Sequence, residues 1–306
     1  MVSQSSSRSD QRKLHGIIVP MVTPFKGREM EEIDLEALAK LTDFLIANGV
    51  NALMVHGTSG EFLMQSAEER KEAVRTVVKA AKGRVPVIAG ISEASTKLCI
   101  SLGKDAEKAG ADAVLSTGPI YYKTSEEGLF GHFNTILENV NLPLMIYNIP
   151  SWIGYNVPAE LVKRLEDQNP GRVYGVKFTT NDLEIFLEYL RVLKDKVAVT
   201  IGADALILSA LQLGAQGATV GSANVLPRET SEIYRLYREK KYAEAIEAQA
   251  KIDGYVQTMG LGTFPAAVKE ALRFVGLDCG QPRPPLLPLT NDQAKLVRDS
   301  LAWKKS

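Results

Sequence analysis

Cysteine is scarce in this chain: only Cys99 and Cys279 occur among 306 residues, far apart and in unrelated contexts. Two isolated cysteines do not make a disulfide framework, and no Cys/His spacing is typical of a zinc site. Histidine is scarce as well, since the chain has three, and His15, His56 and His132 do not cluster in the sequence. A metal enzyme is therefore not expected.

An excess of one charge is also missing, because 36 basic side chains balance 36 acidic ones. This balance gives no argument for nucleic acid or an anionic membrane surface as a partner. No apolar run is long enough to span a bilayer. Residues 1–12 are serine-rich and polar and lack the apolar core of a signal peptide, so we predict a disordered tail on a cytoplasmic protein.

After this tail, short apolar runs alternate with amphipathic segments whose apolar residues recur at three- and four-residue spacing, which predicts helices. Asp34 and Ser66 are expected helix N-caps, and Gly49, Gly110 and Gly214 stand where helix C-caps are expected. The predicted strands are 16–22, 52–57, 85–91, 113–118, 143–149, 173–179, 197–202 and 217–222, and the helices between them are 34–48, 67–82, 95–109, 125–139, 158–167, 182–194 and 204–213.

Strands that alternate with helices about every 30 residues predict an α/β fold, a (β/α)₈ TIM barrel. A doubly wound open sheet is the alternative, but it usually has fewer strands, and no G-x-G-x-x-G motif opens the first unit. After residue 226 the strand pattern stops, and 227–239, 241–259, 264–276 and 290–303 are predicted helices. We therefore expect a tail at 1–12, a catalytic barrel at 13–226 and a C-terminal helical subdomain at 227–306.

One charged side chain interrupts a predicted strand, since Lys177 lies inside the apolar run 173–179. A strand enclosed on both faces is apolar, so a lysine there is costly unless it is paired or performs chemistry. Burial of an amine favours its neutral form, which is a nucleophile. The simpler alternative is that Lys177 sits at a strand end and reaches water.

Barrels of this kind carry their active-site residues at the C-terminal ends of the strands. The turn 57–61, Gly-Thr-Ser-Gly-Glu, exposes N–H groups and two hydroxyls, which suits a carboxylate, although an ordinary helix-capping turn is the alternative. Tyr147 ends the strand before that of Lys177, and a phenol beside an amine transfers protons when hydroxyl neighbours relay them. Thr58 and Tyr121 are the candidates for this relay, while amphipathic packing is the simpler interpretation of both tyrosines.

The segments GTSGE, PIYYK, YNIP, GVKFT and GSANV occur in this order, and with them the chain resembles the dihydrodipicolinate synthase / N-acetylneuraminate lyase family of class I aldolases. The resemblance runs from about Gly16 to Pro288. It implies a Schiff base between Lys177 and pyruvate or another 2-keto acid, without a cofactor. The candidate catalytic residues are Lys177, Tyr147, Thr58 and Tyr121, and the candidate substrate-binding residues are Ser59, Gly57, Gly60, Trp152, Gly202, Asp204, Thr219 and Ser222.

The same resemblance implies an oligomer and raises the question of the second substrate. The family is mostly tetrameric, and its second tyrosine enters the neighbouring subunit's site, so we expect a homotetramer with Tyr121 donated across an interface. Two residues after the proline of YNIP, dihydrodipicolinate synthases usually carry an arginine that grips a carboxylate, and Trp152 replaces it here. Trp152 offers an apolar wall, or only packs on its loop. Asp204 and Ser222 are placed to bind hydroxyls, with an N-cap as the alternative for Asp204.

The stretches Gly60-Glu61-Phe62 and Glu68-Glu69-Arg70, with Pro-x-Tyr-Tyr-Lys further on, look more like the 2-keto-3-deoxy sugar acid aldolases. We therefore favour a 2-keto-3-deoxygluconate-type aldolase, which releases pyruvate and an aldehyde from a 2-keto-3-deoxy sugar acid. The alternatives are a 4-hydroxy-tetrahydrodipicolinate synthase, which condenses pyruvate with aspartate semialdehyde, and a dehydratase or hydratase-aldolase. A silent barrel that only binds a keto acid is a further alternative. The complete set of candidate catalytic residues argues against the silent barrel.

Overall fold

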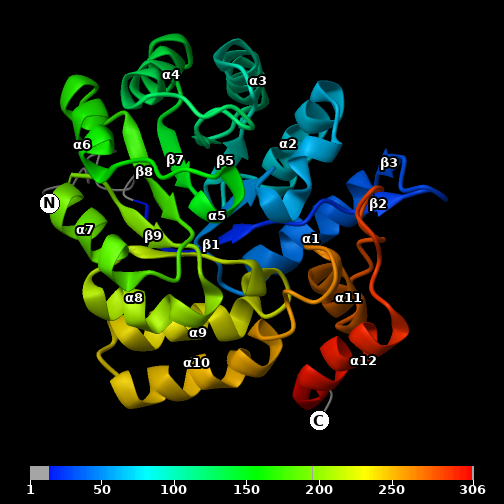
Figure 1. The fold of residues 1–306 in the computed structure, drawn as a ribbon. Helices are drawn as coiled ribbons and strands as arrows, with labels where there is room; N and C mark the ends of the chain where they lie inside the picture. The colour runs from blue at the N-terminus through cyan, green and yellow to red at the C-terminus, as the bar shows by residue number, and fades with distance from the viewer. Residues whose placement is uncertain (1–13, 195, 305–306) are drawn as a thin grey trace, which may run out of the picture.

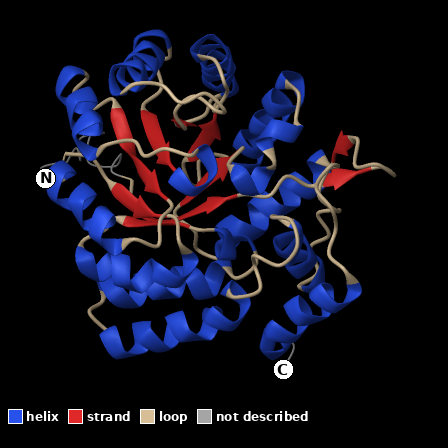
Figure 2. Cartoon of the chain, viewed as in Figure 1, coloured by secondary structure: helices blue, strands red, loops and turns tan. Residues whose placement is uncertain are grey.

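The computed structural model describes residues 14–194 and 196–304, so the predicted tail at 1–12 lies outside the described residues. Eight parallel strands in this part of the chain close into a barrel in the order β1-β10-β9-β8-β7-β6-β5-β4, with helices around them (Figures 1 and 2). This confirms the predicted (β/α)₈ barrel. The strands are β1 (Gly16–Pro20), β4 (Ala52–Val55), β5 (Val87–Gly90), β6 (Ala113–Ser116), β7 (Leu144–Asn148), β8 (Val173–Phe178), β9 (Val199–Ile201) and β10 (Gly217–Thr219).

The helices between the strands begin and end close to the predicted residues. Asp34 caps the first of them by accepting from the Ala37 N–H, and Ser66 forms a capping box with Glu69 at the second. Gly110 and Gly214 end the third and the last in the left-handed conformation, while Gly49 follows the C-cap Asn48. The helices are α1 (Leu35–Ala47), α2 (Ala67–Ala81), α3 (Thr96–Ala109), α4 (Glu126–Asn139), α6 (Ala159–Gln168), α7 (Leu183–Leu193) and α8 (Ile207–Leu213).

The expected boundary between the barrel and the C-terminal helical subdomain lies at residue 226, just before α9 (Pro227–Arg238). Helix α9 packs against α8 and β1, which is the place of an eighth barrel helix. We propose that the helical extension begins after α9, because periodicity predicts a helix without saying where it packs. The extension then comprises α10 (Tyr242–Val256), α11 (Ala266–Phe274), α12 (Asn291–Ser300) and the short 3₁₀ helix η6 (Ala302–Lys304).

Several short elements were not predicted, because two to four residues show no period. A hairpin of β2 (Phe25–Lys26) and β3 (Glu32–Ile33) follows β1, and the one-turn helix α5 (Pro150–Ile153) follows β7. Four 3₁₀ helices lie near the strand ends: η2 (Thr58–Gly60), η3 (Phe62–Met64), η4 (Asp204–Leu206) and η5 (Gly221–Asn224). The predicted helix 204–213 is therefore η4 followed by α8.

The inner and outer faces of the strands belong to two separate apolar cores. On β1, Ile18 packs inside the barrel, while Ile17 and Val19 pack between the strands and the helices. Side chains alternate between faces along a strand, so the neighbours of a residue tell which way it points. On β8, Val176 and Phe178 belong to the outer core. Lys177 between them therefore points into the barrel.

No helix among residues 14–194 and 196–304 is long and apolar enough to cross a membrane.

Candidate active site

Lys177 is buried inside the barrel, with only 4 % of its surface exposed. It pairs in register with Tyr147 of β7 and Thr200 of β9, so its neighbours on both sides are polar. Its Nζ lies 4.1 Å from the centroid of the Tyr147 ring. The alternative that Lys177 merely reaches water is wrong, because the amine lies against the phenol inside the barrel.

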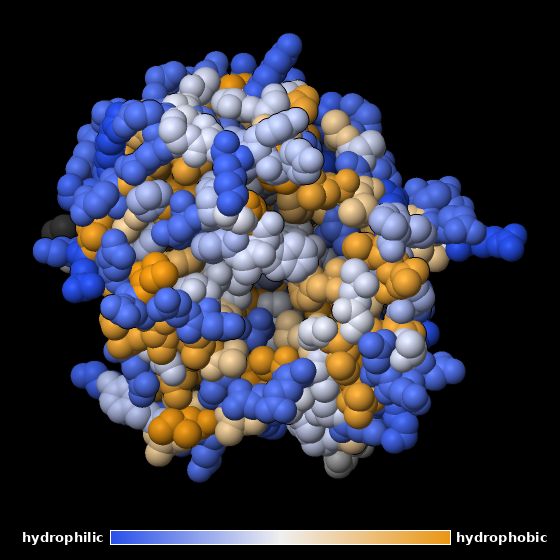
Figure 3. Space-filling view, viewed as in Figure 1, coloured by the Kyte–Doolittle hydropathy of each residue, from blue (hydrophilic) through white to orange (hydrophobic). Residues whose placement is uncertain are grey.

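A cavity of about 570 Å³ contains this amine and is formed by the C-terminal ends of the strands. Figure 3 shows a hollow near the middle of the viewed face, with apolar surface beside it. Of the predicted site residues, the lining includes Thr58, Ser59, Tyr147, Trp152, Lys177, Gly202, Asp204 and Thr219. The lining formed by the described residues does not include Gly57, Gly60, Tyr121 or Ser222.

A phenol and a hydroxyl form the predicted relay pair beside Lys177. The Thr58 Oγ1 and the Tyr147 hydroxyl are 3.3 Å apart, within hydrogen-bond reach. The third predicted member is not with them, because Tyr121 is 87 % exposed and packs edge-on against the ring of Tyr122. Within one chain the structure therefore brings together Lys177, Tyr147 and Thr58, and places Tyr121 outside their cavity.

The predicted carboxylate seat is a 3₁₀ turn, η2, that begins after Gly57 and ends at Glu61. The Gly60 and Glu61 N–H groups donate within the turn, to the carbonyls of Gly57 and Thr58. Ser59, the middle residue of this turn, is buried and lines the cavity. The capping alternative for this turn is wrong, because the following α2 is capped by Ser66.

Asp204 adds a carboxylate to the cavity, and its Oδ1 accepts from the Ser222 N–H at 2.6 Å. Burial raises the pKa of the Asp204 carboxyl, although the backbone N–H groups of Ser222 and Gly221 and the charge of Lys177 act in the opposite direction. The N-cap alternative is wrong, because Ala203 occupies that position. Among the described residues, Ser222 Oγ and the Tyr255 hydroxyl are buried without a hydrogen-bond partner. The backbone N–H of Ser222 therefore holds Asp204, while Ser222 itself is not part of the lining formed by the described residues.

Thr219 lines the cavity and forms a second pair of neighbouring hydroxyls with Thr200. Its Oγ1 lies 2.9 Å from the Oγ1 of Thr200, which also donates to the Val176 carbonyl at 3.1 Å. Thr200 stands in register beside Lys177. The interior around the amine thus contains hydroxyls from three neighbouring strands, β7, β9 and β10.

The loop after α10 closes one side of the cavity and was not predicted to belong to the site. Phe264 in this loop meets Trp152 edge-to-face, with ring centroids 6.3 Å apart. Trp152 itself is 62 % exposed. The signal in the sequence is the break at Gly-Leu-Gly-Thr, 260–263, between two predicted helices. The loop residues in the lining are Met259, Gly260, Gly262, Thr263 and Phe264.

A second cavity of about 210 Å³ adjoins the first and shares six lining residues with it: Thr58, Tyr147, Ile149, Trp152, Thr263 and Phe264. Its remaining lining is mostly apolar: Phe62, Leu63, Met64, Ile120, Ile153 and Leu286, with Glu61 and Thr117 as the polar members. Across both linings, as far as the chain is described, Lys177 is the only lysine or arginine. The described residues contain no group of three or more His, Cys, Asp or Glu that could hold a metal ion.

Comparisons with known proteins match this fold and site over nearly the whole chain. The model of the dihydrodipicolinate synthetase family matches residues 13–303. A 4-hydroxy-tetrahydrodipicolinate synthase of Archaeoglobus fulgidus is 36% identical over 286 residues, which cover 94% of this chain and 96% of that protein. The crystal structure of dihydrodipicolinate synthase from Aquifex aeolicus has a TM-score of 0.91 at 31% identity and covers 95% of this chain and 98% of that one.

A further solved relative was determined with a ligand. YagE of Escherichia coli K12, a prophage protein of the dihydrodipicolinic acid synthase family in complex with pyruvate, has a TM-score of 0.91 at 30% identity and covers 95% of this chain and 99% of that one. The chain belongs to the dihydrodipicolinate synthetase family, whose enzymes are aldolase-type lyases that work through a covalent lysine Schiff base and use no external cofactor.

Proposed function

We propose that Lys177 forms the Schiff base with pyruvate or a related 2-keto acid in the cavity at the strand ends. The observation that carries this proposal is the buried amine 4.1 Å from the Tyr147 ring, with the Thr58 and Tyr147 hydroxyls 3.3 Å apart. Lys177 Nζ adds to the C2 carbonyl carbon, and water leaves to give a protonated imine. Loss of a C3 proton then gives an enamine, whose C3 attacks an aldehyde, and hydrolysis of the imine frees the product and the lysine.

The hydroxyls and the turn have separate tasks in this mechanism. Tyr147 exchanges protons with the carbinolamine and the imine, and Thr58 passes them on, because a phenol alone is a poor acid and a poor base near neutral pH. Ser59 and the N–H groups of Thr58 and Ser59 bind the carboxylate of the keto acid. The carboxylate then turns the C2 carbon toward the amine, which makes the addition effectively intramolecular.

For the second substrate, the first candidate is aspartate semialdehyde, and the reaction is then the synthesis of 4-hydroxy-tetrahydrodipicolinate. The names of the relatives support this choice, at 36% identity over most of the chain. The predicted 2-keto-3-deoxygluconate-type cleavage is the second candidate. The feature that favours it is the charge of the cavity lining. Lys177 is the only lysine or arginine among the described lining residues, and Asp204 adds a carboxylate. Once Lys177 has formed the imine, the described lining offers no further cation to bind the carboxylate of an acidic aldehyde. An assay of both reactions on the same preparation decides between them.

Trp152→Arg is expected to raise kcat/KM for aspartate semialdehyde about 10- to 100-fold, because an arginine there can grip the carboxylate of this substrate. Trp152→Gln is the matched control, since it removes the ring without adding charge. Steady-state rates with both aldehydes measure the effect. An unchanged acceptor preference in Trp152→Arg would show that this position does not set specificity.

We further propose a homotetramer in which Tyr121 enters the smaller cavity of another copy. Tyr121 and Tyr122 are 87% and 71% exposed, and Leu63 and Trp152 are more than half exposed, so these large side chains are accessible to another copy of the chain. The smaller cavity has about 210 Å³ of space, is mostly apolar, and is bounded by Thr58 and Tyr147. A phenol that enters it would complete the relay that a single chain leaves with two members.

Hybrid oligomers test this arrangement. Tyr121→Phe subunits keep Lys177, and Lys177→Arg subunits keep Tyr121, so neither homo-oligomer is fully active. After subunit exchange, a site on a Tyr121→Phe subunit receives an intact tyrosine from its neighbour, and activity should rise above that of either parent. A mixture no more active than Tyr121→Phe alone would show that Tyr121 does not act across an interface.

A further inference from the structure

The turn that contains Thr58 and Ser59 is bound by residues of the C-terminal extension through its last residue, Glu61. Glu61 ends this turn in the left-handed conformation, with φ of 54°, which is uncommon for a residue other than glycine. Its carboxylate is fully buried and forms an ion pair with Lys269 Nζ at 2.7 Å. The other oxygen accepts from the backbone N–H of Arg283 at 2.8 Å. Both contacts come from residues that follow the barrel in the sequence.

The Lys269 side chain is buried as completely as that of Glu61, so this ion pair is shielded from solvent. Burial lowers the pKa of Lys269, while the charge of Glu61 acts in the opposite direction. Its Nζ also donates to the Gln281 carbonyl at 3.0 Å and lies 4.3 Å from the centroid of the Phe25 ring. The Arg283 guanidinium approaches the same ring at 4.2 Å, so two cations of the extension contact Phe25.

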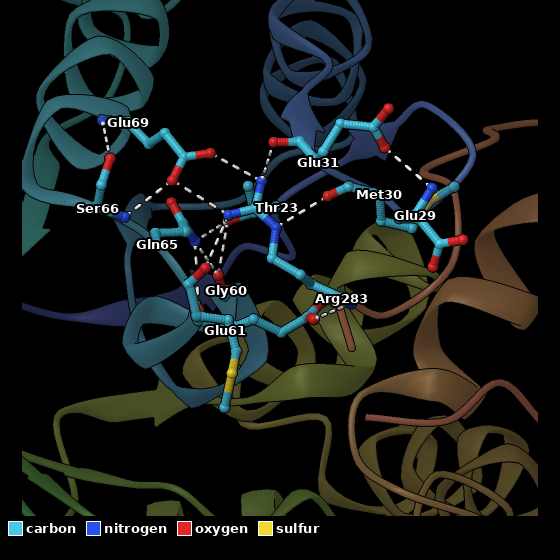
Figure 4. A network of polar contacts seen from close by, with 11 residues as sticks. Thr23, Glu29, Met30, Glu31, Gly60, Glu61, Gln65, Ser66, Glu69 and Arg283 are labelled. Atoms are coloured by element: carbon cyan, nitrogen blue, oxygen red, sulfur yellow. Dashed lines mark hydrogen bonds and ion pairs between the residues drawn. The ribbon is translucent and has the colours of Figure 1, made fainter. Parts of the chain in front are cut away.

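The Arg283 side chain binds the segments on either side of the turn (Figure 4). Its Nε donates to the Met30 carbonyl at 2.8 Å, and its Nη2 donates to the Glu31 carbonyl at 2.9 Å. Its Nη1 donates to the Met64 carbonyl at 2.7 Å, and both Nη atoms reach the Glu69 carboxylate. In Figure 1 the orange-red segment that precedes α12 runs along the β2–β3 hairpin, where these bonds form. One guanidinium thus joins the hairpin, the end of η3 and the start of α2.

Residues that precede the C-terminal extension bind the Gly60 carbonyl of the turn. The Gly60 carbonyl accepts from Thr23 Oγ1 at 2.8 Å and from Gln65 Nε2 at 2.5 Å (Figure 4). Thr23 and Gln65 hold Gly60, whereas in the described part of the chain the Glu61 carboxylate is held by Lys269 Nζ and the backbone N–H of Arg283. The orientation of the Thr58 and Ser59 groups toward Lys177 therefore depends on an anchor in the C-terminal extension.

We propose that Lys269 and Arg283 are positioning residues for the keto acid seat. This inference rests on the proposed function, because it concerns how that seat is oriented. Neither residue belongs to the described lining of either cavity, so their effect passes through Glu61 and the backbone of the turn. Loss of the anchor lets Glu61 leave its uncommon backbone conformation, and the Thr58 and Ser59 groups then turn away from the bound carboxylate.

Lys269→Met is the direct test, with Glu61→Gln as its partner. Each is expected to raise KM for pyruvate about 10- to 100-fold and to slow borohydride trapping of the pyruvate imine at low pyruvate concentration. Arg298→Met is the matched control, because Arg298 pairs at 2.7 Å with Glu270, which neighbours Lys269 on α11 and does not belong to the turn. The control is expected to keep the wild-type KM. Equal increases in KM for Lys269→Met and Arg298→Met would overturn the proposal.

The double variant Glu61→Leu/Lys269→Leu separates positioning from stability. Apolar replacement of a buried ion pair often leaves a protein as stable as before. A stable double variant that still has a raised KM supports positioning, and one with wild-type KM overturns it. If these variants do not fold, Arg283→Lys provides the answer, because it keeps a charge and removes the guanidinium that binds Glu69 and three carbonyls. An unchanged KM in Arg283→Lys would then overturn the proposal. Wild-type protein that traps no pyruvate would instead reject the proposed function itself.

Discussion

Lys177→Arg is expected to lower the rate of pyruvate-dependent turnover at least about 1000-fold while the chain still folds. Arginine keeps a cation in the barrel but stays protonated in proteins, so it cannot add to a carbonyl carbon. The result therefore distinguishes a nucleophile from a buried charge that only orients the substrate. Mass spectrometry after borohydride reduction with pyruvate measures it: the peptide that contains Lys177 gains mass in the wild type and not in the variant.

Two further variants complete this test. Lys177→Met removes both the charge and the nucleophile and is expected to lose as much activity as Lys177→Arg. Lys196→Met is the control, because Lys196 is exposed and pairs with Asp167 on the surface. It should react with pyruvate as the wild type does. A pyruvate adduct that persists in Lys177→Arg on another lysine would contradict the assignment of Lys177.

The barrel was predictable because its information is local. Apolar runs such as 113–118 and 173–179, flanked by segments with helical spacing, are enough to place β6 and β8 and to count the strands. A closed barrel with helices between parallel strands then has one simple order, which puts Tyr147 beside Lys177. The packing of α9 against β1 was not predictable, because it depends on which face the rest of the fold leaves uncovered.

The anchor of the turn was missed for a related reason. Glu61 and Arg283 are 222 residues apart in the sequence, and their contact involves a backbone N–H, which carries no sequence signal. Lys269 is likewise one charged residue in a helix of ordinary pattern, and only its complete burial against Glu61 distinguishes it. The loop at Phe264 falls in the same group, since the sequence shows a break between helices and not the cavity that the loop covers.

The second substrate shows where similarity and local chemistry give different answers. Identity of 36% with proteins named 4-hydroxy-tetrahydrodipicolinate synthase reflects the whole chain, most of which forms the barrel. Trp152 is a single position at the edge of two cavities, where it packs against Phe264. Whole-chain similarity supports the synthase, while this position favours an acceptor without a carboxylate. The sequence favours the 2-keto-3-deoxygluconate-type aldolase, whereas the names of the relatives favour the synthase. The rates with both aldehydes decide between the two reactions.

Tyr147→Phe is expected to lower kcat about 100- to 10,000-fold with a much smaller change in KM for pyruvate. The ring that packs against Lys177 remains, and only the hydroxyl that hydrogen-bonds with Thr58 is lost. Proton transfer during imine formation then lacks its donor, so trapping of the pyruvate imine slows while the carboxylate seat is intact. Stopped-flow trapping and steady-state kinetics measure the two parts separately.

Tyr189→Phe is the matched control for this variant. Its hydroxyl is also buried and accepts from Asn148 Nδ2 at 2.9 Å, one residue after Tyr147 on β7, but it lies in the outer core rather than the cavity. A loss of stability without a loss of imine formation is expected there. Thr58→Val is expected to slow trapping as well, and the double variant with Tyr147→Phe should be little slower than Tyr147→Phe alone, because the two hydroxyls act in one relay. Multiplied effects in the double variant would show that they act independently, and Tyr147→Phe within about threefold of the wild type would remove Tyr147 from the relay.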